Sequence, residues 1–554
     1  MPSPYVVTHM ALRIDDRIPA IALGVVFSAL NAFIYMYLAL KTGMATGLDI
    51  LLLFAAFFVF AVSGSARPRA FLYMMAIMAM SIAAVLAYTD SLGAILISGE
   101  ALPAPGAAMA ALISISLLLG MLASSFFAGY FLRSGFAWPG PKVSVAIISL
   151  LSDNKGPGFR ASATRMGAAA IMGGIVSGLK GIGLLPETIG TTVAGLSLSP
   201  FLAGIGMIIG IQGCLQIALG ALGSLLILYL EEGGSAGYIT HMRSPWIFST
   251  ATAMMVAGAG ISLYVVLKPA LISIYYRKIR LPDKAGTSES IGVGKLITFL
   301  SSHDSIISGV LLLTTTALAA ALIHSLVGVS LPLFCICIPL ALLLMVIETR
   351  GRAETAMSIG IAAFVIVLLT GMAFGNTMSL LLFQGFVLAT TFGFASTLSL
   401  YKVAEHFGIN RRGLRYMLVI GAVTGGIICT PCVDLLNRLY GIGSDVLPAP
   451  YSVMWLEMAR SAVTKVVSPS IDLRFIIIGT VLALIAHRLK VSAVSMALGL
   501  LLPVSASAAI LIGGAIAWIA EKKSLLKDDH GITASGLVAG DILVGLLFAV
   551  KELL

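Results

Sequence analysis

The feature that most constrains this chain is its series of long apolar runs. Residues 18–40, 70–97 and 107–132 are almost entirely apolar, and about 20 apolar residues in a helix span a hydrocarbon core of roughly 30 Å. The strands of a membrane β-barrel would instead alternate apolar and polar residues over roughly 10 positions. The runs therefore predict an all-α polytopic membrane protein.

Composition supports a membrane location and excludes several other classes of protein. Hydrophobic residues make up 59% of the 554 residues and charged residues only 10%, whereas soluble domains carry roughly a quarter charged residues. The net charge of +10 comes from Lys and Arg in short loops between apolar runs, as expected of cytoplasmic loops. We therefore expect no nucleic-acid partner, and the first run, too long for a signal-peptide core, is predicted to remain as a span.

The five cysteines do not form a metal-binding pattern. All lie inside apolar segments, and the pair in Cys429-Thr-Pro-Cys432 lacks the second pair of ligands that a zinc site needs. They are predicted to be small buried residues. No cofactor or metal site is expected.

Apolar runs and the breaks between them predict about 16 transmembrane helices in two repeated halves. The predicted divisions are an N-terminal transmembrane repeat (1–276), a basic cytoplasmic loop (277–303), a linker helix (304–328) and a C-terminal transmembrane repeat (329–554). The predicted spans include 200–229, 329–348, 353–373 and 492–520.

Duplication is visible without gaps in one pair of segments. Laying 199–224 on 492–517 matches Gly206 to Gly499, Ile217 to Ile510 and Gly220 to Gly513. Two weaker matches place Trp138-Pro139-Gly140-Pro141 opposite Leu447-Pro448-Ala449-Pro450, and Lys41-Thr42-Gly43 opposite Arg350-Gly351-Arg352. Repeated halves are common in transporters, and the sequence leaves open whether these repeats are parallel or inverted.

Two Pro-led stretches are predicted to be broken or re-entrant helices. Proline interrupts a helix because it has no backbone N–H. One short apolar stretch begins with Trp138 and Pro139, and another begins with Pro448-Ala449-Pro450. A helix break inside protein exposes carbonyl and N–H groups that can bind ions or a zwitterionic ligand. The alternative is that the prolines of each stretch mark the start of an ordinary helix.

Ionisable groups inside spans are costly and are functional by default. Asp541 lies in an otherwise uncharged run, where a functional role competes with that of a structural, hydrogen-bonded carboxylate. Glu348 and Glu354 alternate with two arginines, so a solvated cluster in a turn between two spans is their simpler interpretation. Lys41 either extends to the interface or points inward to hold a carboxylate.

Amide side chains within apolar runs are further candidates for the binding site. They both donate and accept hydrogen bonds, although more often they only link helices. The chain contains no phosphate-binding loop in the required context, so uphill transport must draw on an ion gradient or on a separate subunit. The amides are Asn31, Gln212, Gln216, Asn376 and Gln384.

Nearly the whole chain resembles the oligopeptide transporter superfamily, which includes the yellow-stripe-like carriers of metal chelates. The motifs lie in the family's order along the chain. In the first half they are Tyr37-Leu-Ala-Leu-Lys41-Thr42-Gly43, Leu132-Arg133 followed by Trp138-Pro139-Gly140, and Ser199-Pro-Phe-Leu-Ala-Gly204-Ile-Gly206-Met-Ile-Ile-Gly210. In the second half they are Ala353-Glu354-Thr355, Lys402 with Asn410-Arg411-Arg412, Ala449-Pro450 and Gly536-Leu-Val-Ala-Gly540-Asp541.

The resemblance implies about 16 helices and proton-driven symport of small peptides or metal chelates. The resemblance also strengthens the case for Lys41, Glu354 and Asp541 as residues of the binding or coupling site. The chain departs from the family where Ala353 replaces the Gly of Gly-Glu-Thr, where Pro141 and Lys142 follow Trp138-Pro139-Gly140, and at Tyr451, where Gln is frequent. These departures concern the substrate more than the fold.

The leading hypothesis is therefore a multi-pass symporter of the cell membrane. Its substrate binds between the halves, Glu354 and Asp541 carry protons, and Lys41 balances charge. Membrane lipid is an expected partner, and a homo-oligomer is compatible with the sequence. The alternatives are a passive channel and an intramembrane aspartyl-type enzyme using Asp90 and Asp541, although residue 538 is Val where that enzyme motif needs Gly.

Overall fold

The computed structural model describes most of the chain. The described residues are 17–42, 52–53, 56–57, 59–60, 67–100, 106–152, 159–190, 195–231, 240–241, 244–258, 261, 303–355, 370–371, 373–444, 447, 449–464, 472–523 and 530–553.

The described part of the chain is almost entirely helical, as predicted. Nine of its helices are long and apolar enough to cross a membrane; the total of about 16 spans stays a prediction. A short antiparallel pair, β1 (Thr188–Gly190) and β2 (Gly195–Ser197), precedes α7. The first-half helices are α1 (Arg17–Thr42), α3 (Pro68–Ile97), α4 (Gly106–Arg133), α5 (Pro139–Ser152), α6 (Phe159–Gly181), α7 (Pro200–Ile209) and α8 (Ile211–Glu231).

The second half repeats this order of long and short helices. It follows α12 (His303–Val327), which packs along α4. The predicted basic loop lies almost wholly outside the described residues, so the division into domains stays a prediction. The second-half helices are α13 (Leu331–Thr355), α15 (Thr377–His406), α16 (Arg411–Tyr440), α17 (Pro450–Val463), α18 (Leu473–Arg488), α19 (Ala493–Leu501), α20 (Val504–Lys522) and α21 (His530–Leu553).

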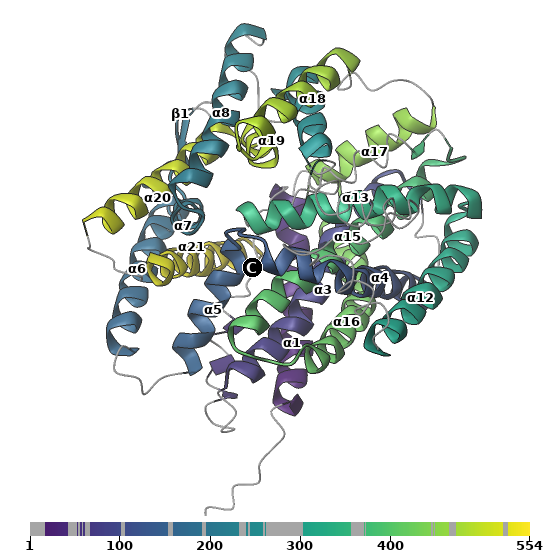
Figure 1. Cartoon of the computed structure of the whole chain (residues 1–554), viewed down its shortest axis with the longest axis horizontal. Helices are drawn as coiled ribbons and strands as arrows, with labels where there is room; N and C mark the ends of the chain where they lie inside the picture. Colours follow the sequence, from purple (N-terminus) through teal and green to yellow (C-terminus); the bar gives the residue numbers. More distant parts are fainter. Residues whose placement is uncertain are drawn as a thin grey trace, which may run out of the picture.

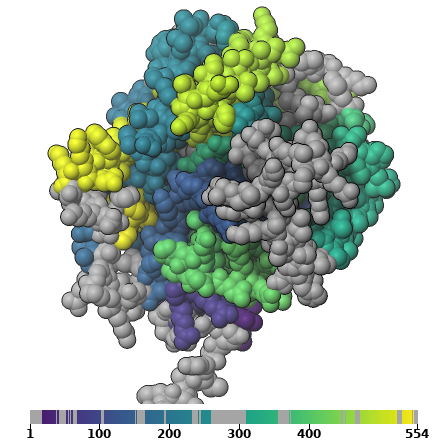
Figure 2. Space-filling model, in the orientation of Figure 1, coloured from purple at the N-terminus to yellow at the C-terminus, as the bar shows by residue number. Residues whose placement is uncertain are grey.

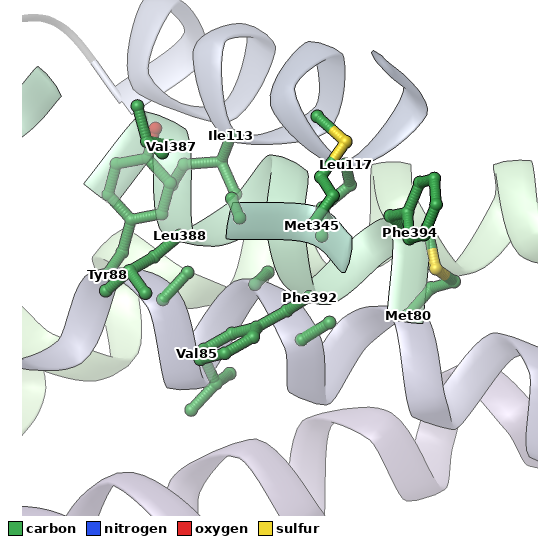
Figure 3. Packing of buried hydrophobic residues seen from close by; sticks show 14 of the residues in the cluster. Met80, Val85, Tyr88, Ile113, Leu117, Met345, Val387, Leu388, Phe392 and Phe394 are labelled. Carbon is green, nitrogen blue, oxygen red and sulfur yellow. The ribbon is translucent and has the colours of Figure 1, made fainter. Parts of the chain in front are cut away.

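Four long helices, α3, α4, α15 and α16, form the centre of the molecule (Figure 1). Their apolar side chains interlock, with Tyr88 of α3 packed against Gly385 of α15, and Figure 3 shows the surrounding cluster. In most of these helices the apolar residues are not confined to one face, because the helices are buried on several sides. Glycines allow the backbones of these helices to approach closely. The close approaches are Gly421 to Ile77, Gly425 to Ser81, Gly120 to Thr390, Gly393 to Leu117 and Gly426 to Ala110.

These approaches show that the repeats are inverted. Increasing residue numbers run together in α3 and α16, and Lys402 at the end of α15 bonds the Leu132 carbonyl at the end of α4, so those pairs are parallel. Helices α4 and α16 are antiparallel, since Ser114 bonds the Ala422 carbonyl and Ala110 approaches Gly426. Helix α3 is therefore antiparallel to its counterpart α15. This settles a question that Lys and Arg positions left open.

A second unit consists of α7, α8, α19 and α20 and lies to one side of the centre (Figure 1). A Cβ on Gly206 would lie 1.9 Å from the Ile510 carbonyl oxygen, and a Cβ on Gly499 would lie 1.9 Å from that of Ile217. The same ungapped match that relates Gly206 to Gly499 relates Ile217 to Ile510. The contacts are thus exchanged between the halves, as in a two-fold interface.

The outer surface of this unit is apolar. Figure 2 shows α8 and the segment of α18 and α19 at the edge of the molecule. Such a face suits contact with lipid rather than water. The exposed leucines of α8 are Leu215, Leu219, Leu222, Leu226 and Leu230.

Two predicted continuous spans are in fact broken helices. The span predicted at 200–229 is divided at Gly210, whose φ of 81° ends α7. The span predicted at 492–520 is divided at Leu502 and Pro503 between α19 and α20. The apolar pattern concealed these breaks because both halves of each segment are equally apolar.

The two Pro-led stretches are short helices that begin in the same way. Trp138 and Ala449, at φ of 47° and 45°, directly precede the prolines that start α5 and α17. The Trp138 N–H bonds the Ala353 carbonyl, and the Ala449 N–H bonds the Leu40 carbonyl, each at 2.7 Å. Trp138 therefore corresponds to Ala449, which corrects the predicted register by two residues. At 14 residues each, α5 and α17 are too short to span a bilayer.

Candidate functional site

Asp541 lies at the N-terminus of the broken helix α7. It is carried by α21, which packs along α6, and only 8% of its surface is exposed. Its Oδ2 accepts hydrogen bonds from the Phe201 N–H at 2.9 Å and from Ser199 Oγ at 3.1 Å. Lys180 Nζ lies 3.6 Å from Oδ1. The start of α7 and the lysine therefore both place positive charge beside this carboxylate.

Glu354 occupies the corresponding place at α19. Its Oε2 accepts hydrogen bonds from Ser492 Oγ and, at 3.1 Å, from Ser495 Oγ. Its Oε1 accepts one from Arg350 Nε at 2.7 Å. Ser492 is the N-cap of α19, just as Ser199 is the N-cap of α7. The two matched sites thus each contain a carboxylate, an N-cap serine and a cation. The repeat relates the two serines, whereas Glu354 and Asp541 come from α13 and α21, the first and last helices of the second half.

The two matched sites differ in how tightly the cation is held. Arg350 donates a direct charge-assisted hydrogen bond to Glu354, whereas the Lys180 nitrogen stands 3.6 Å from Asp541. A carboxylate in either place fixes the position of a short helix, because it satisfies donors at the start of that helix.

Asp90 lies at the start of the Pro-led helix α17. Its Oδ1 accepts a hydrogen bond from Ser452 Oγ at 3.3 Å, and Ser452 is in the first turn of α17. In the part of the chain that the structure describes, Asp90 and Asp541 have different partners on different helices. They do not form the shared-proton pair that an aspartyl enzyme requires.

Comparison with known proteins identifies the family. The model of the family described as OPT oligopeptide transporter protein matches residues 18–551, nearly the whole chain. The chain belongs to the oligopeptide transporter family. No curated protein matches the chain. The family consists of transporters, so this polytopic membrane protein is a transporter and the enzyme alternative is wrong.

Glu348 is a structural residue of the transporter rather than part of a solvated turn. Helix α13 continues to Thr355, so the predicted break between spans at 348 and 353 is absent. Glu348 is fully buried and accepts a hydrogen bond from Arg352 Nε at 2.7 Å. Arg352 also bonds Ser396 and lies over the Phe392 ring. The pair ties α13 to α15.

Breaking this pair is expected to destabilise the transporter. Arg352→Met leaves a buried carboxylate without its cation, which costs about 3–5 kcal/mol. The double variant Glu348→Gln/Arg352→Met is expected to recover most of that loss, as measured by thermal unfolding in detergent. The control is Arg438→Met, which breaks the exposed Asp434 pair and should cost less than about 1 kcal/mol. Equal losses in both single variants would contradict the assignment.

The other predicted site residues are dispersed. Asn376 is exposed and caps α15 by accepting from the Ser379 N–H at 2.6 Å, which is a structural role. Gln212 is exposed on α8, and Gln216 accepts from the Ser492 N–H at 3.4 Å. Asn31 is fully buried in α1, where it interacts with other residues of the protein.

Three more predicted residues lie in the central helices and at the Pro-led starts. Gln384 is fully buried in α15, and neither polar atom of its side chain has a hydrogen-bond partner among the described residues. The same holds for Nε1 of the buried Trp138, which precedes Pro139 of α5. Tyr451 is half-buried in the first turn of α17. The side chain of Lys41 lies outside the described residues.

Sequence reasoning missed Lys180 as the partner of Asp541 and the serine partners of both carboxylates. Lys180 ends an apolar helix and resembles an interface lysine, and serines within apolar runs are common. The one available signal was the gapless repeat, since it aligns Ser199 with Ser492. Among the described residues, no group of His, Cys, Asp and Glu could hold a metal ion.

Proposed function

We propose that this transporter is a proton-coupled symporter of small peptides or metal chelates in the cell membrane. The observation that carries the proposal is the buried Asp541 carboxylate at the N-terminus of a broken helix. Broken helices at the interface of inverted repeats are where secondary transporters bind substrates and coupling ions. Asp541 and Glu354 are the proposed proton carriers, and Lys180 and Arg350 balance their charge.

Two buried side chains whose polar atoms lack a hydrogen-bond partner among the described residues support a solute pathway through the centre. A buried amide or indole N–H without a hydrogen bond costs free energy, which a bound solute or water recovers. Gln384 and Trp138 provide such groups.

The distribution of charge supports an orientation in the membrane. One end of the central helices, where α3 and α16 begin and α4 and α15 end, carries a concentration of basic residues. By the positive-inside rule this end faces the cytoplasm. The basic residues are Arg67, Arg69, Arg133, Lys402, Arg411, Arg412 and Arg415.

Uptake into proteoliposomes tests the proposal. A pool of di- to hexapeptides with iron and nickel chelates is offered with and without an inward proton gradient, and the contents are measured by mass spectrometry. Gradient-dependent accumulation of a pool member is the expected result. Flux that neither saturates nor follows the gradient would favour a channel.

A further inference from the structure

A cavity of about 200 Å³ lies at the break between α7 and α8. Gly210 forms the break, because its N–H bonds the Gly206 carbonyl of α7 while its own carbonyl accepts from the Cys214 N–H of α8. Ile209 at the end of α7 and Ile211 at the start of α8 both line the cavity. By helix geometry, the last carbonyls of α7 and the first N–H groups of α8 have no partners within their helices.

Charges of opposite sign line the same cavity. Lys142 comes from the first turn of α5, and Glu521 comes from the last turn of α20. Trp518, one turn before Glu521, adds an aromatic wall. The cavity is thus lined by a cation, an anion and residues on both sides of a helix break, and such groups can bind the two ends of a zwitterion.

The duplication supplies an internal comparison for this cavity. The repeat match places Leu225 and Leu228 where Trp518 and Glu521 stand, and Val453 where Lys142 stands. The second break carries Pro503, which has no N–H to offer. At the three aligned positions, two charged side chains and a tryptophan at the first break therefore correspond to apolar residues at the second. A helix break with only a structural role would not require this difference in charge between the halves. A binding site for a charged ligand would require it.

We propose that this cavity binds a small zwitterion, with Glu521 on its ammonium group and Lys142 with the start of α8 on its carboxylate. The inference rests on the proposed function and adds the place and mode of substrate binding. The same short helix α7 carries the cavity at its C-terminal end and the Asp541 site at its N-terminal end. A ten-residue helix is rigid over its length, so movement at one end is transmitted to the other. That geometry couples zwitterion binding to the proton site.

Blocked dipeptides test each half of the site separately. The probes are dialanine, N-acetyl-dialanine and dialanine amide, and their dissociation constants are measured by calorimetry on the purified full-length transporter. Glu521→Gln is expected to weaken dialanine about tenfold and to leave N-acetyl-dialanine unchanged. Lys142→Gln is expected to weaken dialanine similarly and to leave dialanine amide unchanged.

Matched exposed charges outside the cavity serve as controls. Glu231→Gln and Lys523→Gln remove charges of the same kinds and should change no dissociation constant. Equal effects of Glu521→Gln on free and acetylated peptide would overturn the inference, and so would an absence of dialanine binding. Proton-driven accumulation of other pool members in either case would leave the proposed function standing. Thermal unfolding confirms that each variant is folded.

Discussion

Asp541→Asn is expected to abolish accumulation of substrate against its gradient while preserving exchange of substrate across the membrane. Asparagine is nearly isosteric, and its carbonyl still accepts from the Phe201 N–H and from Ser199. It remains neutral, so it neither binds nor releases a proton and no longer pairs with Lys180. Gradient-driven uptake should fall to the level of protein-free liposomes, while counterflow of labelled substrate persists.

Controls separate this result from general damage. Asp434→Asn removes an exposed carboxylate that pairs with Arg438 and should transport as the parent does. Glu354→Gln tests the matched site at α19, where full proton dependence in the variant would refute a proton role for Glu354. Undiminished proton-driven accumulation by Asp541→Asn would remove Asp541 from the mechanism.

Gly206→Leu is expected to destabilise the transporter by forcing apart its two broken helices. A Cβ at this position lies 1.9 Å from the Ile510 carbonyl oxygen, so α7 and α20 must separate. Overpacking of this kind costs about 1–3 kcal/mol and occasionally more, and contact with backbone places it at the upper end. Thermal unfolding of the purified protein measures the loss, and Gly499→Leu should reproduce it through Ile217.

The matched control for overpacking is Gly129→Leu. No atom lies within 4 Å of a Cβ at Gly129 in α4, so the added side chain has open space. Its unfolding temperature should stay close to that of the parent. If Gly206→Leu and Gly129→Leu were equally stable, the close packing of the two broken helices would be wrong.

The sequence was informative where a pattern is local or exactly repeated. Apolar runs predicted the membrane fold, because each span must hide its own backbone polar groups from lipid. The gapless match of Gly206 with Gly499 predicted the duplication, and the structure turns that match into reciprocal contacts. The prolines after Trp138 and Ala449 marked two short helices, because proline cannot continue a helix.

Local patterns failed where the decisive partner is distant in sequence. Apolar residues on both sides of Gly210 hid the break, since hydrophobicity does not report φ. Glu348 looked solvated because its neighbours are charged, yet the burial of Glu348 depends on how α13 packs against α15.

The sequence by itself determined that this chain is a duplicated, helical transporter of the oligopeptide transporter family. Only the tertiary structure decided that the repeats are inverted and that Asp541 and Glu354 hold matched helix starts. The reason is physical: Asp541 meets Ser199 across 342 positions of the chain, and Ser492 meets Glu354 across 138. Contacts of that range arise from packing of whole helices, which no local spacing of residues encodes.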